Sequence, residues 1–147
     1  MTDGLPDALA GRLGYLLKHA QQALATSAAP ALAPFGIDGR ELTVLSLLAA
    51  DIPLSQQEAA EQLGIDRTTM VAMVDTLEGK GLVARHRSPE DRRKNIVALT
   101  PSGRTCLTRA GQARDQAERA FLAPLSAPEA DRFVRALRIL VSAARER

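Results

Sequence analysis

The sequence is poor in the residues that bind metals, form disulfides or span membranes. Its 147 residues include one cysteine, Cys106, and two histidines that lie far apart in the chain. This set allows no intramolecular disulfide and gives no recognisable ligand spacing, so we expect a reducing compartment and no metal site. No apolar run approaches the roughly 18 to 20 residues of a membrane helix. The N-terminus, MTDGLPDALAGRL, lacks the basic start and apolar run of a signal peptide, so the expected location is the cytoplasm, with no membrane contact.

Sequence signatures of catalysis are missing as well. The chain has no Gly-x-Ser-x-Gly elbow, no glycine-rich phosphate loop and no cluster of cysteine, histidine and carboxylate residues. We therefore expect neither an enzyme nor a cofactor-binding protein.

Aromatic residues are scarce, at 3% of a chain that has no tryptophan. Apolar residues still reach 46%, so the core must be built from leucine, valine, isoleucine and many alanines. Alanine favours helices and lets them pack closely, so the fold should be mainly helical. The net charge of +2 is too small to indicate a nucleic-acid partner by itself. The charge is nevertheless concentrated in one segment, which contains Arg85, Arg87, Arg92, Arg93 and Lys94.

Helices are predicted wherever apolar residues recur every three or four positions behind a capping residue. The first helix is expected from residue 7 to about 31, ended by Pro30, Pro34 and Gly36. Asp66 and Thr100 can cap helices over 67 to about 80 and 101 to about 122. Reciprocal capping boxes predict three further starts, at Asp38 with Glu41, Ser55 with Glu58, and Ser126 with Glu129.

Between residues 55 and 100 the order of elements is informative. A short helix is followed by a turn at Gly64 and by a second helix from residue 67. After Gly81 the segments LVARHR and NIVALT alternate apolar and polar residues, as strands do, and the loop SPEDRRK joins them. The sequence therefore predicts a winged helix-turn-helix, in a mainly α fold with a small two- to three-stranded antiparallel β-wing.

The second helix of such a unit fits the major groove of DNA, with its N-terminal residues nearest the base edges. Its middle contains Val71 and Ala72, so direct base readout should be thin and DNA shape should contribute to selectivity. The predicted DNA-binding residues on this helix are Arg67, Thr68, Thr69, Asp75 and Thr76.

The hairpin tip can reach an adjacent minor groove, where narrow stretches attract an inserted arginine. Arg92 and Arg93 are the candidates at the tip, and Asp91 is expected to hold a neighbouring guanidinium in a fixed direction. Arg85, Arg87 and Lys94 complete the predicted DNA-binding set, although strand residues such as Arg85 and Arg87 are often only solvated. His86 is expected at the surface, with a phosphate contact as the alternative.

Two stretches resemble the multiple-antibiotic-resistance regulator (MarR) family. DRRKNIVALTPSG is similar to the family's wing signature, and LEGKGLVAR is similar to the junction between recognition helix and wing. The resemblance covers nearly the whole chain and implies a homodimeric DNA-binding transcriptional regulator. The regulator is expected to be a repressor that binds a pseudo-palindromic operator in double-stranded DNA. A small-molecule effector would release the DNA.

The resemblance also implies a single domain over residues 1–147. In that domain a winged helix-turn-helix lobe at 38–100 lies between dimerisation helices at 5–33 and 101–147. It implies that Asp91 supports the wing and that Arg93 enters the minor groove.

Several alternatives stay open. Tyr15 and His19 lie one helical turn apart and are candidate ligand-pocket residues, with ordinary packing as the other interpretation. Cys106 is expected to be buried and unreactive, because peroxide sensors of the family carry their cysteine in the first helix, at a position that this sequence does not match. The rival functions are a winged-helix module that binds another protein and an enzyme whose catalytic residues the sequence does not reveal.

Overall fold

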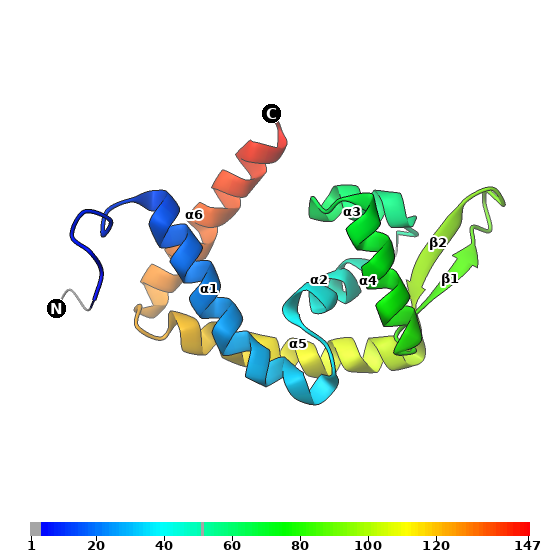
Figure 1. The fold of residues 1–147 in the computed structure, drawn as a ribbon, viewed down its shortest axis with the longest axis horizontal. Coiled ribbons are helices and arrows are strands. Elements are labelled where there is room, and N and C mark those ends of the chain that lie inside the picture. The colour runs from blue at the N-terminus through cyan, green and yellow to red at the C-terminus, as the bar shows by residue number, and fades with distance from the viewer. Residues whose placement is uncertain (1–3, 51) are drawn as a thin grey trace.

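The computed structural model describes residues 4–50 and 52–147. Over these residues the order of elements agrees with the predicted winged helix-turn-helix (Figure 1). The elements are α1 (Leu13–Leu32), the 3₁₀ turn η1 (Ala33–Phe35), α2 (Gly39–Leu48), α3 (Gln56–Leu63), α4 (Arg67–Gly79), β1 (Val83–Arg87), β2 (Asn95–Leu99), α5 (Pro101–Leu122) and α6 (Ala127–Arg145).

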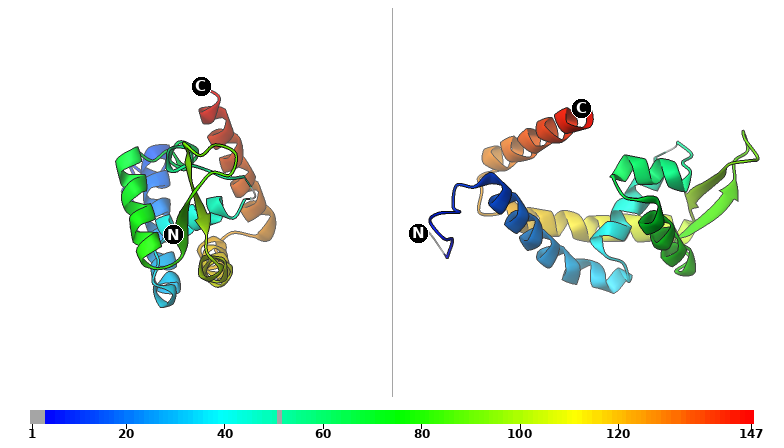
Figure 2. Two further views of the ribbon diagram at one scale, coloured as in Figure 1. Left: turned by 90° about the vertical axis from the view of Figure 1, so that its right-hand side faces the viewer. Right: turned by 45° about the horizontal axis from the view of Figure 1, so that its top comes forward.

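The molecule has a lobe at one end and long helices at the other. The lobe contains α2, α3, α4 and the two strands, and α5 runs from beneath the lobe to the start of α6 (Figure 1). The helix α1 packs along α5. The last helix, α6, has no buried residue (Figure 2). Near its end, Arg145 donates to the carbonyl of Gln62 in the lobe at 3.2 Å.

The hydrophobic core lies inside the lobe and along its contact with α5. Its largest fully buried side chains come from α1, α2, α4 and β1, and they are Leu32, Leu42, Val44, Leu45, Met70, Val74, Leu77 and Val83. The core is aliphatic, as the scarcity of aromatic residues predicts. It holds α4 and the wing in a fixed relation to each other.

The wing is an antiparallel hairpin in which Val83 pairs with Leu99 and Arg87 pairs with Asn95. A single bridge joins Leu54 to Val97, where the amide of Val97 donates to the carbonyl of Leu54 at 2.9 Å. The sheet therefore has two strands and one bridging residue on its inner edge. Across the described residues, no helix is both long and apolar enough to cross a membrane.

The prediction for the first helix was wrong at its start, which lies at Leu13 and not at residue 7, whereas its end at Leu32 agrees with the predicted end at about residue 31. Residues before Leu13 form turns in which the amides of Leu9 and Ala10 donate to the carbonyl of Pro6. Glycines at positions 11 and 14 lower the helix propensity there. Pro30 does not end the helix but lies inside it, and the chain turns only at Gly36, where φ is +67°. Pro30 lies close to the end of the helix at Leu32, and α1 packs along α5.

All three predicted capping boxes are confirmed. Asp38, Ser55 and Ser126 each accept from the amide three residues on, and the glutamate at that position accepts from the cap's own amide. Asp66 and Thr100 cap α4 and α5 as predicted. The local sequence therefore determines where these five helices begin.

Candidate nucleic-acid interface

The turn before α4 fixes the first residues of the recognition helix. Gly64 adopts φ +64°, a left-handed conformation that glycine tolerates best, and it ends α3. Asp66 then caps α4 by accepting from the amide of Thr69 at 3.0 Å and from the Thr69 hydroxyl at 2.6 Å. These two bonds from Thr69 hold the pKa of the Asp66 carboxyl below its usual value. The Asp66 carboxylate is therefore ionised at neutral pH, and its negative charge interacts favourably with the positive end of the helix dipole.

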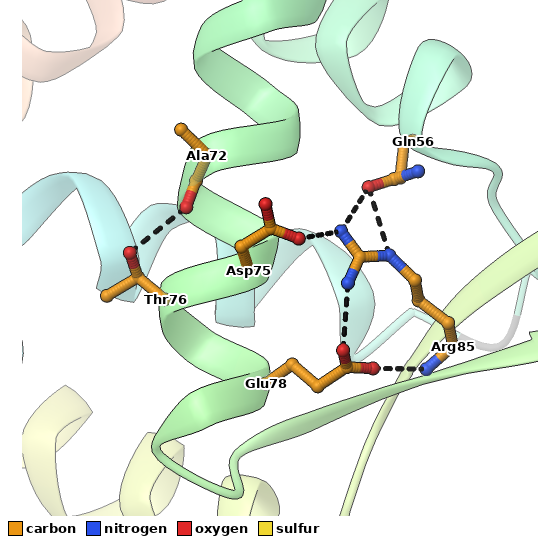
Figure 3. Close-up of polar contacts among 6 residues, drawn as sticks. All are labelled: Gln56, Ala72, Asp75, Thr76, Glu78 and Arg85. Carbon is orange, nitrogen blue, oxygen red and sulfur yellow. Dashed lines mark hydrogen bonds and ion pairs between the residues drawn. The ribbon is translucent and has the colours of Figure 1, made fainter.

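The face of α4 that points away from the core carries most of the predicted contact residues. Arg67, Thr68, Asp75 and Thr76 are exposed, whereas Thr69 is half-buried. Thr76 donates its hydroxyl to the carbonyl of Ala72 at 3.0 Å (Figure 3), and Thr69 donates to Asp66. In the part of the chain that the structure describes, only Arg67 and Thr68 of this set have side chains without a hydrogen-bond partner.

The wing tip is organised by backbone contacts around Ser88 and Asp91. The buried Ser88 accepts from the amides of Glu90 and Asp91, each at 3.3 Å, and its own amide donates to the carbonyl of Lys94 at 2.7 Å. Asp91 accepts from the amide of Arg93 at 3.0 Å. The Asp91 carboxylate thus bonds to the main chain of the turn, and not to a guanidinium as the sequence suggested. Ser88 was missed, because its burial depends on the folded turn.

Three arginines of the wing extend into solvent. Arg87 lies at the end of β1, and Arg92 and Arg93 lie in the tip, and all three are exposed. Among residues 4–50 and 52–147, none of the three has a side-chain hydrogen bond or an ion pair. The first turn of α4 and the wing tip both lie at the end of the lobe away from α5 (Figure 1). Exposed arginines beside the start of a helix form a surface suited to phosphate groups.

The two other predicted basic residues are bonded inside the protein. Arg85 pairs with Asp75 at 2.5 Å and with Glu78 at 2.9 Å. Lys94 pairs with Glu58, the glutamate of the capping box that Ser55 opens at the start of α3. The hydrogen bond from Lys94 is the main reason why the pKa of Glu58 falls to about 2, and the bonds to Ser55 contribute further. Arg85 and Lys94 therefore connect the wing to the helix-turn-helix.

A cavity of about 480 Å³ lies between the long helices and the lobe. Apolar side chains of α1 form one wall, and polar residues at the start of α2 and on α5 form the other. Tyr15 and His19 stack with ring centroids 4.1 Å apart, but they lie nearer the start of α1 and do not line this cavity. The lining residues, which no sequence pattern brings together, are Gln21, Leu24, Ala25, Ala28, Ala29, Leu32, Asp38, Gly39, Arg40, Thr43, Arg114 and Glu118.

Cys106 is half-buried on α5, so the sequence overestimated its burial. Burial and the negative charge of Glu41 raise the pKa of its thiol above the usual value, although the charge of Lys80 opposes this. The thiol is therefore protonated at neutral pH, and a protonated thiol is a poor nucleophile.

Comparisons with known proteins agree with the family that the sequence resembles. The model of the MarR family matches residues 39–94, which are the lobe up to the wing tip. A putative transcriptional regulatory protein for the hcr operon of Thauera aromatica is 34% identical over 122 residues, which cover 82% of this chain and 74% of that protein. The chain belongs to the MarR family.

Two solved structures resemble this MarR-family protein over nearly its whole length. The transcriptional repressor CouR, bound to a 23-mer DNA duplex, is 38% identical with a TM-score of 0.81, and the match covers 94% of this chain and 96% of that one. CouR from Rhodococcus jostii RHA1, bound to p-coumaroyl-CoA, is 28% identical with a TM-score of 0.83, and the match covers 95% of both. The protein is thus a DNA-binding transcriptional regulator with a winged helix-turn-helix.

Proposed function

We propose that the regulator represses transcription by binding a pseudo-palindromic operator. The observation that carries this is the exposed surface formed by the start of α4 and the wing tip, which both carry arginines without a partner among the described residues. In this proposal α4 enters the major groove through Arg67, Thr68 and Thr69, and the wing grips the flank through Arg87, Arg92 and Arg93, Arg93 reaching the minor groove. Asp91 supports the wing by holding the turn that carries Arg93. The proposal is supported by the CouR repressor solved on DNA.

The test measures the affinity of the protein for two kinds of DNA. One is a duplex that the protein selects from a random-sequence pool, and the other is the DNA upstream of its own gene. Arg93→Ala should weaken binding to the selected duplex by about tenfold. The matched control is Arg119→Ala, an exposed arginine near the far end of α5, which should bind like wild type. Affinity should also fall steeply with salt, because each phosphate contact releases counterions. If wild type selects no duplex, or if affinity ignores salt, the protein-binding rival is favoured.

We also propose that the terminal helices form a homodimer, as the expected boundaries of 5–33 and 101–147 imply. The outer faces of α1 and α6 expose a row of large apolar side chains, which are Leu13, Leu16, Leu17, Phe133, Val134, Leu140 and Val141. Leu13 is 65% exposed and Leu140 is 58% exposed. Apolar patches of this extent on a soluble protein mark an interaction surface. A symmetric dimer would place two lobes on one operator, about one helical turn apart.

Light scattering during size exclusion tests the dimer. Leu140→Asp should shift the molar mass toward that of one chain, because a buried, unpaired carboxylate is costly at an interface. Arg138→Ala, on the same helix and exposed, should leave the mass unchanged. A wild-type protein that stays monomeric at micromolar concentrations would remove the basis for α6 as a dimerisation helix.

We propose that a small-molecule effector enters the cavity between α1, α2 and α5 and releases the DNA. Its volume of about 480 Å³ falls within the range of roughly 300–1,000 Å³ that ligand pockets occupy. Because α1 belongs to the predicted dimer region and α2 to the lobe, a ligand there contacts both. The p-coumaroyl-CoA complex of a related CouR supports an effector. Tyr15 and His19, predicted as pocket residues, would contact only a ligand that extends beyond this cavity.

The effector proposal is tested by titrating the protein–DNA complex with p-coumarate and p-coumaroyl-CoA. Ala28→Phe, at a position that lines the cavity, should abolish release while leaving DNA affinity intact. Ala23→Phe, an exposed site of α1 outside the cavity, should respond like wild type. Release that is equal in both variants would place the effector elsewhere.

We assign the protein no catalytic reaction, and we place it in the cytoplasm, where its DNA target is found. The support is the family itself, whose relatives carry the names of transcriptional regulators.

A further inference from the structure

One side chain, Arg85 of β1, connects the wing to both helices of the helix-turn-helix. Its Nη2 donates to Asp75 Oδ1 at 2.5 Å and to Gln56 Oε1 at 2.8 Å (Figure 3). Its Nη1 donates to Glu78 Oε1 at 2.9 Å, and its Nε donates to Gln56 Oε1 at 3.3 Å. The backbone amide of Arg85 adds a bond to Glu78 Oε2 at 3.3 Å. Since Gln56 begins α3 and the two carboxylates lie on α4, the contacts fix the wing against both helices.

These bonds use most of the donors that an arginine has. A guanidinium carries five N–H groups in a rigid fork. Nε donates one, Nη1 one and Nη2 both of its hydrogens, so four of the five are engaged within the protein. A bidentate contact to a phosphate or to guanine needs two free N–H groups on one edge. Arg85 therefore cannot make such a contact without releasing one of its partners.

The charges of the cluster give Arg85 a second role. Asp75 and Glu78 have side chains that are 61% and 45% exposed on the recognition helix, whereas the Arg85 side chain is only 25% exposed. Without Arg85, the two carboxylates on α4 would be uncompensated on the surface that must approach the phosphates of DNA. Like charges brought together across an interface oppose binding. With Arg85 in place, the cluster of one cation and two carboxylates has a net charge of −1 instead of −2.

We propose that Arg85 is a positioning residue for DNA binding. It holds the wing at a fixed angle to α4 and offsets part of the negative charge of Asp75 and Glu78, and it does not contact the DNA. Asp75 then orients Arg85 and is not a reader of bases. Lys94, paired with Glu58, anchors the second strand to α3 in the same way. This inference rests on the proposed operator binding, and it reassigns three residues that the sequence placed among the DNA contacts, which are Asp75, Arg85 and Lys94.

The experiment compares Arg85→Met in two backgrounds, one with Asp75 and Glu78 intact and one carrying Asp75→Asn with Glu78→Gln. The probe is the duplex selected by the wild-type protein, with a scrambled duplex of the same composition beside it. With the carboxylates present, Arg85→Met should weaken binding to the selected duplex roughly tenfold. In the background that carries Asp75→Asn with Glu78→Gln, Arg85→Met should change the affinity for this duplex by less than about twofold. The reason is that Arg85 can act through the carboxylates only while they are present.

Arg87→Met is the matched control, because Arg87 lies on the same strand and has no partner among the described residues. It should lose the same affinity in both backgrounds and on both duplexes, as a phosphate contact does. Arg85→Met should instead weaken the selected duplex more than the scrambled one. If Arg85→Met unfolds the lobe, Arg85→Lys, which keeps the charge but has no planar fork, replaces it in the same comparison.

The outcomes separate the two proposals. An equal loss for Arg85→Met in both backgrounds would show a direct DNA contact and overturn the positioning role. If the wild-type protein and the Arg87 variant bind both duplexes equally weakly, the operator-binding function itself fails.

Discussion

Gly103→Ala should destabilise the protein, although alanine is the better helix former. Gly103 lies in the first turn of α5, directly against the start of the wing. A Cβ at this position would lie 2.0 Å from the carbonyl oxygen of Leu82 and 3.0 Å from its carbonyl carbon. Those atoms are backbone and cannot rotate away. Leu82 also accepts from the amide of Thr100 at 3.1 Å, so moving it strains a second contact.

The size of the effect follows from that overlap. Non-bonded carbon atoms rest at about 3.5–4.0 Å, so α5 and β1 would have to separate by more than about 1 Å. Overpacking of this kind costs about 1–3 kcal/mol, against a helix-propensity gain of at most about 1 kcal/mol. Because the overlap is with a backbone oxygen at 2.0 Å, the cost lies near the upper end of that range and the net loss is about 2 kcal/mol. At about 2–4 °C per kcal/mol for a chain of this length, Tm should fall by roughly 4–8 °C.

The assay is thermal unfolding by circular dichroism at one fixed protein concentration, because dimerisation makes Tm depend on concentration. The matched control is Gly111→Ala in the same helix, where the nearest contact of an added Cβ is the Arg114 side chain at 3.9 Å. That variant should be as stable as wild type or more stable. A Gly103 variant with unchanged or raised Tm would refute the close approach between α5 and the wing.

Three further outcomes are expected. Because the pKa of Glu58 is lowered from 4.5 to about 2, its ion pair stabilises the fold above about pH 4.5 and is lost as pH falls toward 2. Between pH 4.5 and about pH 2, Glu58→Gln should therefore lose less thermal stability than wild type. Parallel profiles of Tm against pH for the two proteins would contradict the ion pair. Thr100→Ala should cost about 1–2 kcal/mol in urea unfolding, since its hydroxyl donates to Gly81 at 2.6 Å and accepts from Gly103. Thr100→Ser should recover most of this. Cys106 should react with thiol reagents at least about tenfold more slowly than free cysteine, because its pKa is raised. Unfolding in urea should bring the reaction rate of Cys106 up to that of free cysteine. A fast reaction in the folded protein would instead show that the thiol is present as a thiolate.

Local signals in the sequence predicted the wing and the helix starts well, because each is decided by residues within four positions. The capping boxes at Asp38, Ser55 and Ser126 are of this kind, and so is the alternation that predicts the two strands. The start of the first helix was predicted poorly, because the apolar spacing continues back to residue 9 although the chain before Leu13 forms turns. Its end at Leu32 lies close to the predicted end.

The basic segment shows the same division between local and tertiary information. The sequence determined that five basic residues gather on the wing and that a recognition helix precedes it. It placed Arg85, Arg87 and Arg93 together among the DNA-binding residues, because a solvated, a paired and a DNA-facing arginine look alike in sequence. Only the tertiary structure brings Asp75, Glu78 and Gln56 around Arg85 and leaves Arg93 free. The reason is that an ion pair depends on which elements pack together, whereas a helix cap or a strand pattern depends on neighbours in the chain.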